Sequence, residues 1–94
     1  GIKADQTEAY FTGWDWTPHD VKLLAIEIAV HSSLTSIGLS HNNLNSEAAK
    51  ALAPAIAVAS SLTECDLRYN TFDEPAKQLL RDSVKDRPSF KLEL

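Results

Sequence analysis

One sequence pattern occurs twice in this chain. The segment that begins at Leu34 has the sequence LTSIGLSHNNL, and the segment that begins at Leu62 has the sequence LTECDLRYNTF, which defines a 28-residue period. The apolar positions and one asparagine recur, so that Leu34, Ile37, Leu39, Asn42 and Leu44 return as Leu62, Cys65, Leu67, Asn70 and Phe72. A period of roughly 20–50 residues is typical of repeat architectures, in which each unit buries its apolar face against the next. The repeat therefore constrains the fold more than any other feature.

Each unit predicts a short strand followed by a helix. Residues 34–39 alternate apolar and small polar residues, as a strand does. Three of them would point inward (Leu34, Ile37, Leu39), and their neighbours would lie on the exposed side (Thr35, Ser36, Gly38, Ser40). Residues 62–67 repeat this pattern, with Thr63, Glu64, Asp66 and Arg68 as a charged exposed row that Lys91 and Glu93 extend. Residues 90–94 predict a last edge strand, one residue out of the 28-residue spacing.

Capping residues and prolines predict where the helices begin and end. Thr17 followed by Pro18, then Ser46, then Asp73 are favourable helix starts. Pro54 lies inside the second helix, so we expect a kink or a short break near residues 52–53. Pro88 is expected to end the third helix.

The N-terminal third departs from the regular pattern. Residues 1–8 are polar and predict a loose arm, whereas residues 9–33 predict a degenerate first unit that caps the array. Residues 9–16 (AYFTGWDW) contain four of the seven aromatic residues. They form either an aromatic cap over the core or an exposed pair, Trp14 and Trp16, that serves as a binding hot spot.

The pattern L-x-x-L-x-L-x-x-N-x-L followed by a helix resembles the signature of leucine-rich repeat proteins. The 28-residue length and the helix sequence EAAKALAPAI resemble the ribonuclease-inhibitor-type subfamily. Cys65 and Phe72 stand where that pattern has leucine, and Trp14 stands where it has asparagine.

This resemblance implies an α/β fold, a short right-handed leucine-rich-repeat solenoid of about three repeats. Parallel strands would line the concave face and helices the convex face. The whole chain, 1–94, would be one domain: an arm (1–8), a degenerate capping repeat (9–33), a regular repeat (34–61), a further repeat (62–89) and a terminal edge strand (90–94). Asn42 and Asn70 would stack as a structural ladder and bond backbone groups left unpaired by the turns.

Composition limits the classes of partner and the cellular compartment that we expect for this chain. A formal net charge of −4 argues against nucleic acid, because phosphate binding needs a basic face. No apolar run approaches the ~20 residues of a membrane span, so we expect no membrane partner. Cys65 is the only cysteine and nothing resembles a signal peptide, which favours a reducing, cytoplasmic location.

The sequence contains no convincing catalytic constellation. His19, His31 and His41 lack the spacing of a metal site, and three glycines are too few for a phosphate-binding loop. We therefore expect no enzyme activity, no cofactor and no metal. His41 and its repeat equivalent Tyr69 are either solvent-facing turn positions or a contact site on the rim.

We expect a non-enzymatic protein–protein interaction module that uses the exposed strand rows. The candidate contact residues are Glu64, Asp66, Arg68, Tyr69, His41 and Trp14. The alternative is a structural or self-associating unit, a homodimer formed through the edge strand or through the aromatic first unit.

Overall fold

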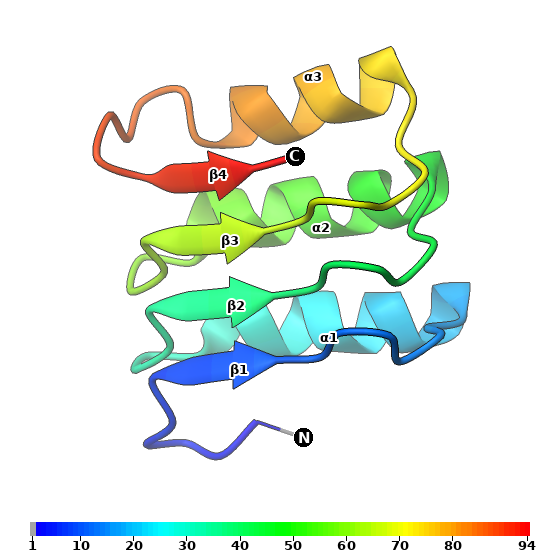
Figure 1. The fold of residues 1–94 in the computed structure, drawn as a ribbon. Coiled ribbons are helices and arrows are strands. Elements are labelled where there is room, and N and C mark those ends of the chain that lie inside the picture. Colours follow the sequence, from blue (N-terminus) through cyan, green and yellow to red (C-terminus); the bar gives the residue numbers. More distant parts are fainter. Residues whose placement is uncertain (1) are drawn as a thin grey trace.

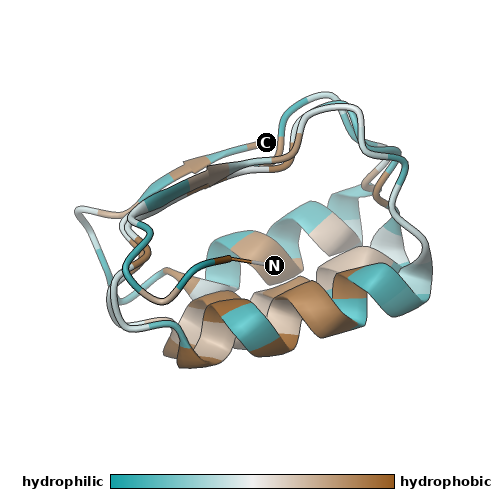
Figure 2. Cartoon of the chain, turned by 90° about the horizontal axis from the view of Figure 1, so that it is seen from below, coloured by the Kyte–Doolittle hydropathy of each residue, from teal (hydrophilic) through white to brown (hydrophobic). Residues whose placement is uncertain are grey.

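The computed structural model describes residues 2–94, in which four strands alternate with three helices (Figure 1). The elements are β1 (Glu8–Tyr10), α1 (Pro18–Val30), β2 (Ser36–Gly38), α2 (Ser46–Val58), β3 (Glu64–Asp66), α3 (Glu74–Ser83) and β4 (Lys91–Glu93). The strands form one parallel sheet in the order β1-β2-β3-β4. The helices lie side by side against one face of that sheet (Figure 2). The predicted α/β class is therefore confirmed.

The register of the sheet follows the sequence period. Ile37 of β2 pairs with Ala9 of β1 and with Cys65 of β3, and each partner is one full period away in the sequence. Cys65 in turn pairs with Leu92 of β4, which falls one position short of a full period. The last unit is thus shorter than the others, as the spacing predicted.

The core lies between the sheet and the helices. The predicted inward residues Leu34, Ile37 and Leu39 are each 1% exposed, and the equivalent residues Leu62, Cys65 and Leu67 are buried to the same extent. Alanines on α2 are buried beside them, which lets this central helix lie close to its neighbours. Leu52, Ile56 and Leu80 fill the space between helices and sheet.

Two of the three predicted helix starts are confirmed. Thr17 caps α1 in a capping box with Asp20, and Asp73 caps α3. The start of α2 was placed one residue too late, because Asn45 is the cap and Ser46 is the first helical residue. Asn45 accepts the N–H of Ala48 at 3.3 Å. Asparagine is at least as favourable as serine at this position, so the two candidates could not be separated by preference alone.

Of the kink or short break that we expected near residues 52–53, the break does not occur. Helix α2 runs without interruption from Ser46 to Val58. A residue at position 54 would normally donate its N–H to the carbonyl of Lys50, and proline cannot. Both Pro54 and Lys50 are exposed, so solvent can satisfy that carbonyl.

Helix α3 ends at Ser83, so Pro88, which we expected to end it, is not the residue at which the helix stops. Arg87, which follows the helix, folds back onto the end of α2. Its guanidinium donates to the carbonyls of Ile56 at 2.7 Å and Ala59 at 2.9 Å, and also to that of Leu62. The carbonyls of Ile56 and Ala59 also accept the backbone N–H groups of Ala59 and Leu62, so Arg87 adds a charged donor to carbonyls at and after the end of α2.

The segment from Ile2 to Thr7 is bonded to two elements. The Ile2 N–H donates to Glu27 Oε1 at 3.0 Å, and the Thr7 carbonyl accepts the N–H groups of Thr35 and Ser36. Strand β1 begins at Glu8, within the arm predicted for residues 1–8. Gly1, the first residue of that arm, lies outside the described residues.

Candidate functional site

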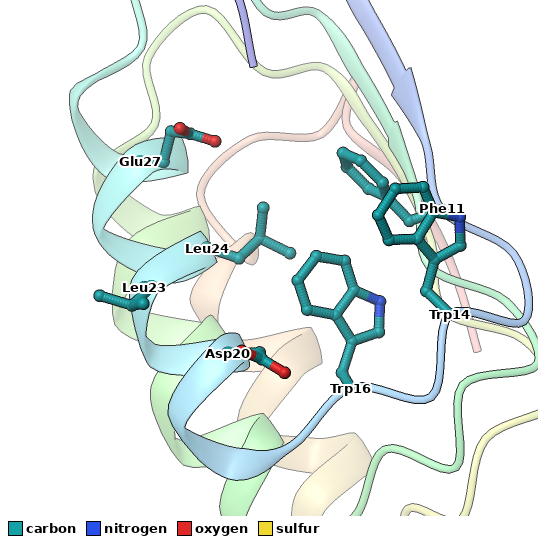
Figure 3. Close-up of a pocket in the computed structure, with 7 residues that line it drawn as sticks. All are labelled: Phe11, Trp14, Trp16, Asp20, Leu23, Leu24 and Glu27. Atoms are coloured by element: carbon teal, nitrogen blue, oxygen red, sulfur yellow. The ribbon is translucent and has the colours of Figure 1, made fainter. Parts of the chain in front are cut away.

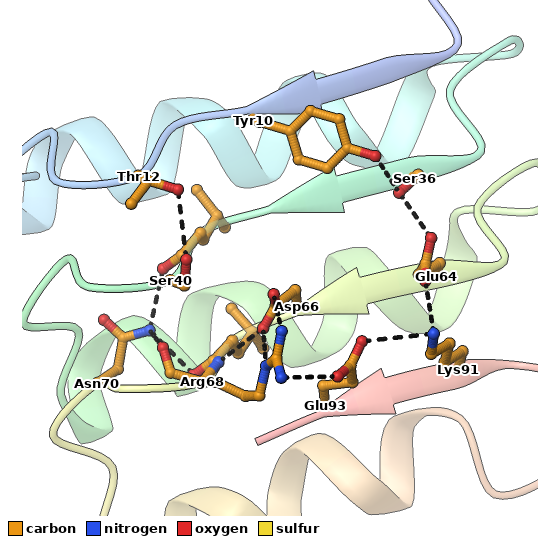
Figure 4. Close-up of polar contacts among 12 residues, drawn as sticks. Tyr10, Thr12, Ser36, Ser40, Glu64, Asp66, Arg68, Asn70, Lys91 and Glu93 are labelled. Carbon is orange, nitrogen blue, oxygen red and sulfur yellow. Dashed lines mark hydrogen bonds and ion pairs between the residues drawn. The ribbon is translucent and has the colours of Figure 1, made fainter.

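The face of the sheet opposite the helices carries polar side chains (Figure 4). Side chains alternate along a strand, so the residues on either side of each buried central residue point to this face. We call it the open face and define it by Glu8, Tyr10, Ser36, Glu64, Asp66, Arg68, Lys91 and Glu93. Three of the predicted contact residues, Glu64, Asp66 and Arg68, lie on it.

Two cations bridge three carboxylates on the open face (Figure 4). Arg68 contacts Asp66 through two bonds of 3.0 Å and Glu93 at 3.3 Å. Lys91 Nζ lies 3.3 Å from Glu64 and 3.7 Å from Glu93. These contacts hold the charged side chains in a defined arrangement across β3 and β4.

The contacts of this network favour the charged forms of Asp66 and Lys91. The hydrogen bond from the Arg68 side chain is the main cause that lowers the pKa of Asp66. Hydrogen bonding to Glu64, followed by the charge of Glu93, raises the pKa of Lys91. The side chains of Arg68 and Lys91 remain 47% and 66% exposed, so the charges are accessible to a partner. Exposed ion pairs contribute little stability, so the free energy of unfolding depends only weakly on this network.

The β2 part of the open face is covered, which corrects the prediction that Ser36 and Gly38 are exposed. Ser36 is only 7% exposed. The Tyr10 ring lies over Gly38 so closely that a Cβ there would be 2.5 Å from Tyr10 Cδ1. Tyr10 donates to Glu8 at 2.7 Å and lies 3.2 Å from Ser36 Oγ, which donates to Glu64 at 3.0 Å. A continuous polar chain therefore crosses β1, β2 and β3 (Figure 4).

Sequence reasoning missed Tyr10. Its signal was available, because Tyr10 precedes Gly38 by one period and pairs with it in the sheet. A glycine beside an aromatic residue on the same face allows the ring to lie flat over the strand. The absence of a side chain at Gly38 is therefore what makes room for Tyr10.

His41 and Tyr69 form a stacked pair on the rim of the sheet, just after β2 and β3. Their ring centroids are 4.6 Å apart and the planes differ by 16°. Both residues have positive φ, 58° and 61°, a conformation that costs a non-glycine residue ~1–3 kcal/mol. The Arg68 guanidinium lies 5.9 Å from the Tyr69 ring centroid, so this rim pair adjoins the charged network.

Asn42 and Asn70 bond the backbone of neighbouring units. Asn42 Oδ1 accepts the Trp14 N–H at 2.6 Å, and its Nδ2 donates to the carbonyls of Phe11 and Ser40. Asn70 Oδ1 accepts the N–H groups of Asn42 and Leu44. Its Nδ2 donates to the carbonyls of Leu39, Leu67 and Arg68. These amides connect turns, and Asn42 is only 2% exposed.

Trp14 belongs to a different surface from the other predicted contact residues. It lines a groove against α1 together with Phe11 and Trp16 (Figure 3). Trp14 is 63% exposed and stacks on Trp16 with a centroid distance of 5.9 Å.

Residues 2–94 also bear on metal binding, thiol reactivity and membrane insertion. No group of three or more His, Cys, Asp or Glu side chains in that range is arranged to hold a metal ion. Burial raises the pKa of Cys65 to about 12, which leaves its thiol protonated and unreactive near neutral pH. None of α1, α2 and α3, the helices of the described chain, has the length and hydropathy needed to cross a membrane.

Comparison with known proteins does not assign this chain to a family. No family model matches this chain, and no curated protein matches it.

Proposed function

We propose that the chain is a leucine-rich repeat protein of the ribonuclease-inhibitor type that binds another protein through the open face. In this proposal the four strands line the concave side of a short solenoid. The 28-residue period, the matching register and the bonds made by Asn42 and Asn70 support it.

The observation that carries the binding proposal is the charged network on a sheet face that the helices leave uncovered. Arg68 and Lys91 are oriented by carboxylates while they remain accessible. Side chains that are already ordered lose less conformational entropy when a partner docks. The rim pair, His41 and Tyr69, extends this surface with exposed aromatic area.

The charge of the open face indicates the kind of partner. Its network holds three carboxylates against two cations, and Glu8 lies on the same face. A protein with a basic surface complements this excess of negative charge, whereas nucleic acid does not. We infer no enzyme activity and no cofactor, and the single buried thiol supports a reducing, cytoplasmic location.

A capture experiment tests this function. Immobilised wild-type chain is compared with the variant Glu64→Gln/Glu93→Gln in an extract of the source organism. The control is Glu47→Gln/Glu74→Gln, which removes two exposed carboxylates from the first turns of α2 and α3. We expect proteins held by the wild type and by the control to be lost from the open-face variant. Identical capture by all three chains would exclude the open face as the contact surface.

Self-association is the second candidate, because within residues 2–94 the edge strands β1 and β4 each pair on one side only. Unpaired edges can add a strand from another chain. Sedimentation velocity at increasing protein concentration separates the candidates. A sedimentation coefficient that stays at the monomer value throughout would exclude the homodimer.

A further inference from the structure

A groove lies along the flank of α1 that faces away from α2. Its volume is about 360 Å³, at the lower end of the ~300–1,000 Å³ typical of ligand pockets. Aromatic side chains form one wall and α1 forms the other (Figure 3). The lining residues are Phe11, Trp14, Trp16, Asp20, Leu23, Leu24 and Glu27. We call this surface the end groove.

The flank of α1 in the end groove differs from the same flank of the next helix. Helices α1 and α2 begin at Pro18 and Ser46, one repeat period apart, so Asp20 and Glu27 correspond to Ala48 and Ala55. Both alanines are buried, and the flank of α2 that carries them packs on α1. Small residues allow such close packing, whereas unpaired carboxylates oppose it. The flank of α1 that lines the end groove is therefore unsuited to an apolar neighbour.

Both carboxylates are held in place. Asp20 Oδ2 accepts the N–H of Thr17 at 3.1 Å, and hydrogen bonding to Thr17 lowers the pKa of Asp20. Glu27 Oε1 accepts the N–H of Ile2 at 3.0 Å. No Lys or Arg is among the described residues that line the groove. The end groove thus presents two negative charges without a cation between them.

Apolar side chains in the groove remain open to solvent. Trp14 is 63% exposed and Leu23 is 54% exposed. The rings of Phe11 and Trp16 support Trp14, at centroid distances of 5.2 Å and 5.9 Å. Tryptophan is the aromatic residue that attracts a cation most strongly, and nearby carboxylates add to that attraction. Exposed apolar area of this kind marks interaction sites.

We propose that the end groove binds a basic, amphipathic segment of another protein. A lysine or arginine of that segment lies beside Trp14 and pairs with Asp20 and Glu27, while an apolar side chain packs on Leu23. A second copy of this chain is a poor occupant, because a symmetric contact through the same patch would place the carboxylates of both copies opposite one another. This site is separate from the open face and does not depend on the function proposed for it.

Intrinsic fluorescence tests the proposal directly, because Trp14 and Trp16 are the only tryptophans of the chain and both line the groove. The probe is a synthetic amphipathic peptide of leucine and lysine. The comparison peptide has glutamate in place of every lysine. We expect a saturable change in the emission with the lysine peptide, weaker at high salt, and no saturable change with the glutamate peptide.

Variants locate the binding. Asp20→Asn/Glu27→Gln removes both charges but keeps an oxygen acceptor at each position, and we expect about tenfold or greater loss of affinity. Glu47→Gln, an exposed carboxylate on α2 outside the groove, is the matched control and should bind as the wild type does. The open-face variant Glu64→Gln/Glu93→Gln should also bind normally. Far-UV circular dichroism checks that each variant is folded.

Several outcomes would overturn the proposal. The first is the absence of a saturable response to the lysine peptide up to about 1 mM. The second is an equal response to both peptides. The third is an equal loss of affinity in the control Glu47→Gln. Loss of binding in the open-face variant with retention in Asp20→Asn/Glu27→Gln would move the basic partner to the open face.

Discussion

Replacement of Asn42 by alanine tests whether the buried amides hold neighbouring units together. The Asn42 side chain accepts one backbone N–H, from Trp14, and donates to two backbone carbonyls, those of Phe11 and Ser40. Alanine makes none of these bonds. The variant therefore leaves three backbone groups without a partner at the junction between the first two units.

The expected decrease in the free energy of unfolding depends on how deeply those three backbone groups are buried. A buried backbone group that loses its partner costs ~1–3 kcal/mol. Phe11 and Ser40 are only partly buried, so water can reach part of this region, and values near the lower limit apply. We expect Asn42→Ala to lower the free energy of unfolding by about 2–4 kcal/mol. A chain of this size has roughly 5–14 kcal/mol in total, so the loss is a large share.

Urea unfolding followed by circular dichroism measures this loss, and tryptophan fluorescence reports on the first unit. The matched control is Asn43→Gly. Asn43 is exposed and has a φ of 54°, a conformation that glycine tolerates. The control should change the free energy of unfolding by less than about 0.5 kcal/mol. Because Asn42 bonds Trp14, the fluorescence midpoint should fall at least as much as the midpoint from circular dichroism.

A decrease of less than about 0.5 kcal/mol in the free energy of unfolding of Asn42→Ala, with an unchanged dependence on urea, would contradict this role of the amide. An equal loss in Asn43→Gly would also refute it, because the effect would then come from the turn and not from the bonds of the buried amide.

Three further changes have defined outcomes. Arg87→Met should lower the free energy of unfolding by about 2–4 kcal/mol, because three backbone carbonyls at and after the end of α2 lose a charged donor. The control in the same denaturation assay is Arg81→Met, which replaces an exposed arginine on α3. Asp66 has a lowered pKa when folded, so its contribution to stability is present above the ordinary carboxyl value of 3.8 and is lost as the pH falls through the folded value. The difference in urea midpoint between wild type and Asp66→Asn should therefore shrink between about pH 6 and about pH 3, and a constant difference would contradict this cause. Cys65 has a raised pKa of about 12, so its burial favours folding below about pH 9 and opposes it as the pH rises further; a thiol reagent at about pH 8 should label Cys65 only at the rate of unfolding, and rapid labelling of the folded chain would contradict its burial.

The architecture could be predicted because the strongest signals in the sequence are local and repeated. The recurrence of Ile37 at Cys65 predicted the register of β2 against β3, and Thr17 with Pro18 predicted the start of α1. The shortened last unit also followed from spacing alone, since Leu92 pairs with Cys65. These features depend on periodicity and on capping preferences, which neighbouring residues in the chain determine.

The features that could not be predicted depend on contacts between units. The 28-residue period places Tyr10 beside Gly38, but no pattern within one unit indicates that the Tyr10 ring turns across the sheet to cover Gly38. Arg87 follows α3 in the chain, yet its guanidinium donates to the end of α2, and no local pattern indicates that contact. The uninterrupted course of α2 across Pro54 depended on which side of the helix faces solvent. For the candidate site, the sequence identified the charges Glu64, Asp66 and Arg68 but not how they pair.

The spacing of the strand pairs has a consequence for local unfolding. Each pairing joins segments from consecutive units, and within residues 2–94 none joins β1 to β4. Either end can therefore open while the centre stays intact, and amide hydrogen exchange should be slowest in β2, β3 and α2. The end groove lies on β1's side of the molecule, at one of these two ends. A ligand bound there would slow exchange most in α1 and the segment before it, so occupancy of the groove could be detected as local protection in addition to the global stabilisation that any ligand of the folded state causes.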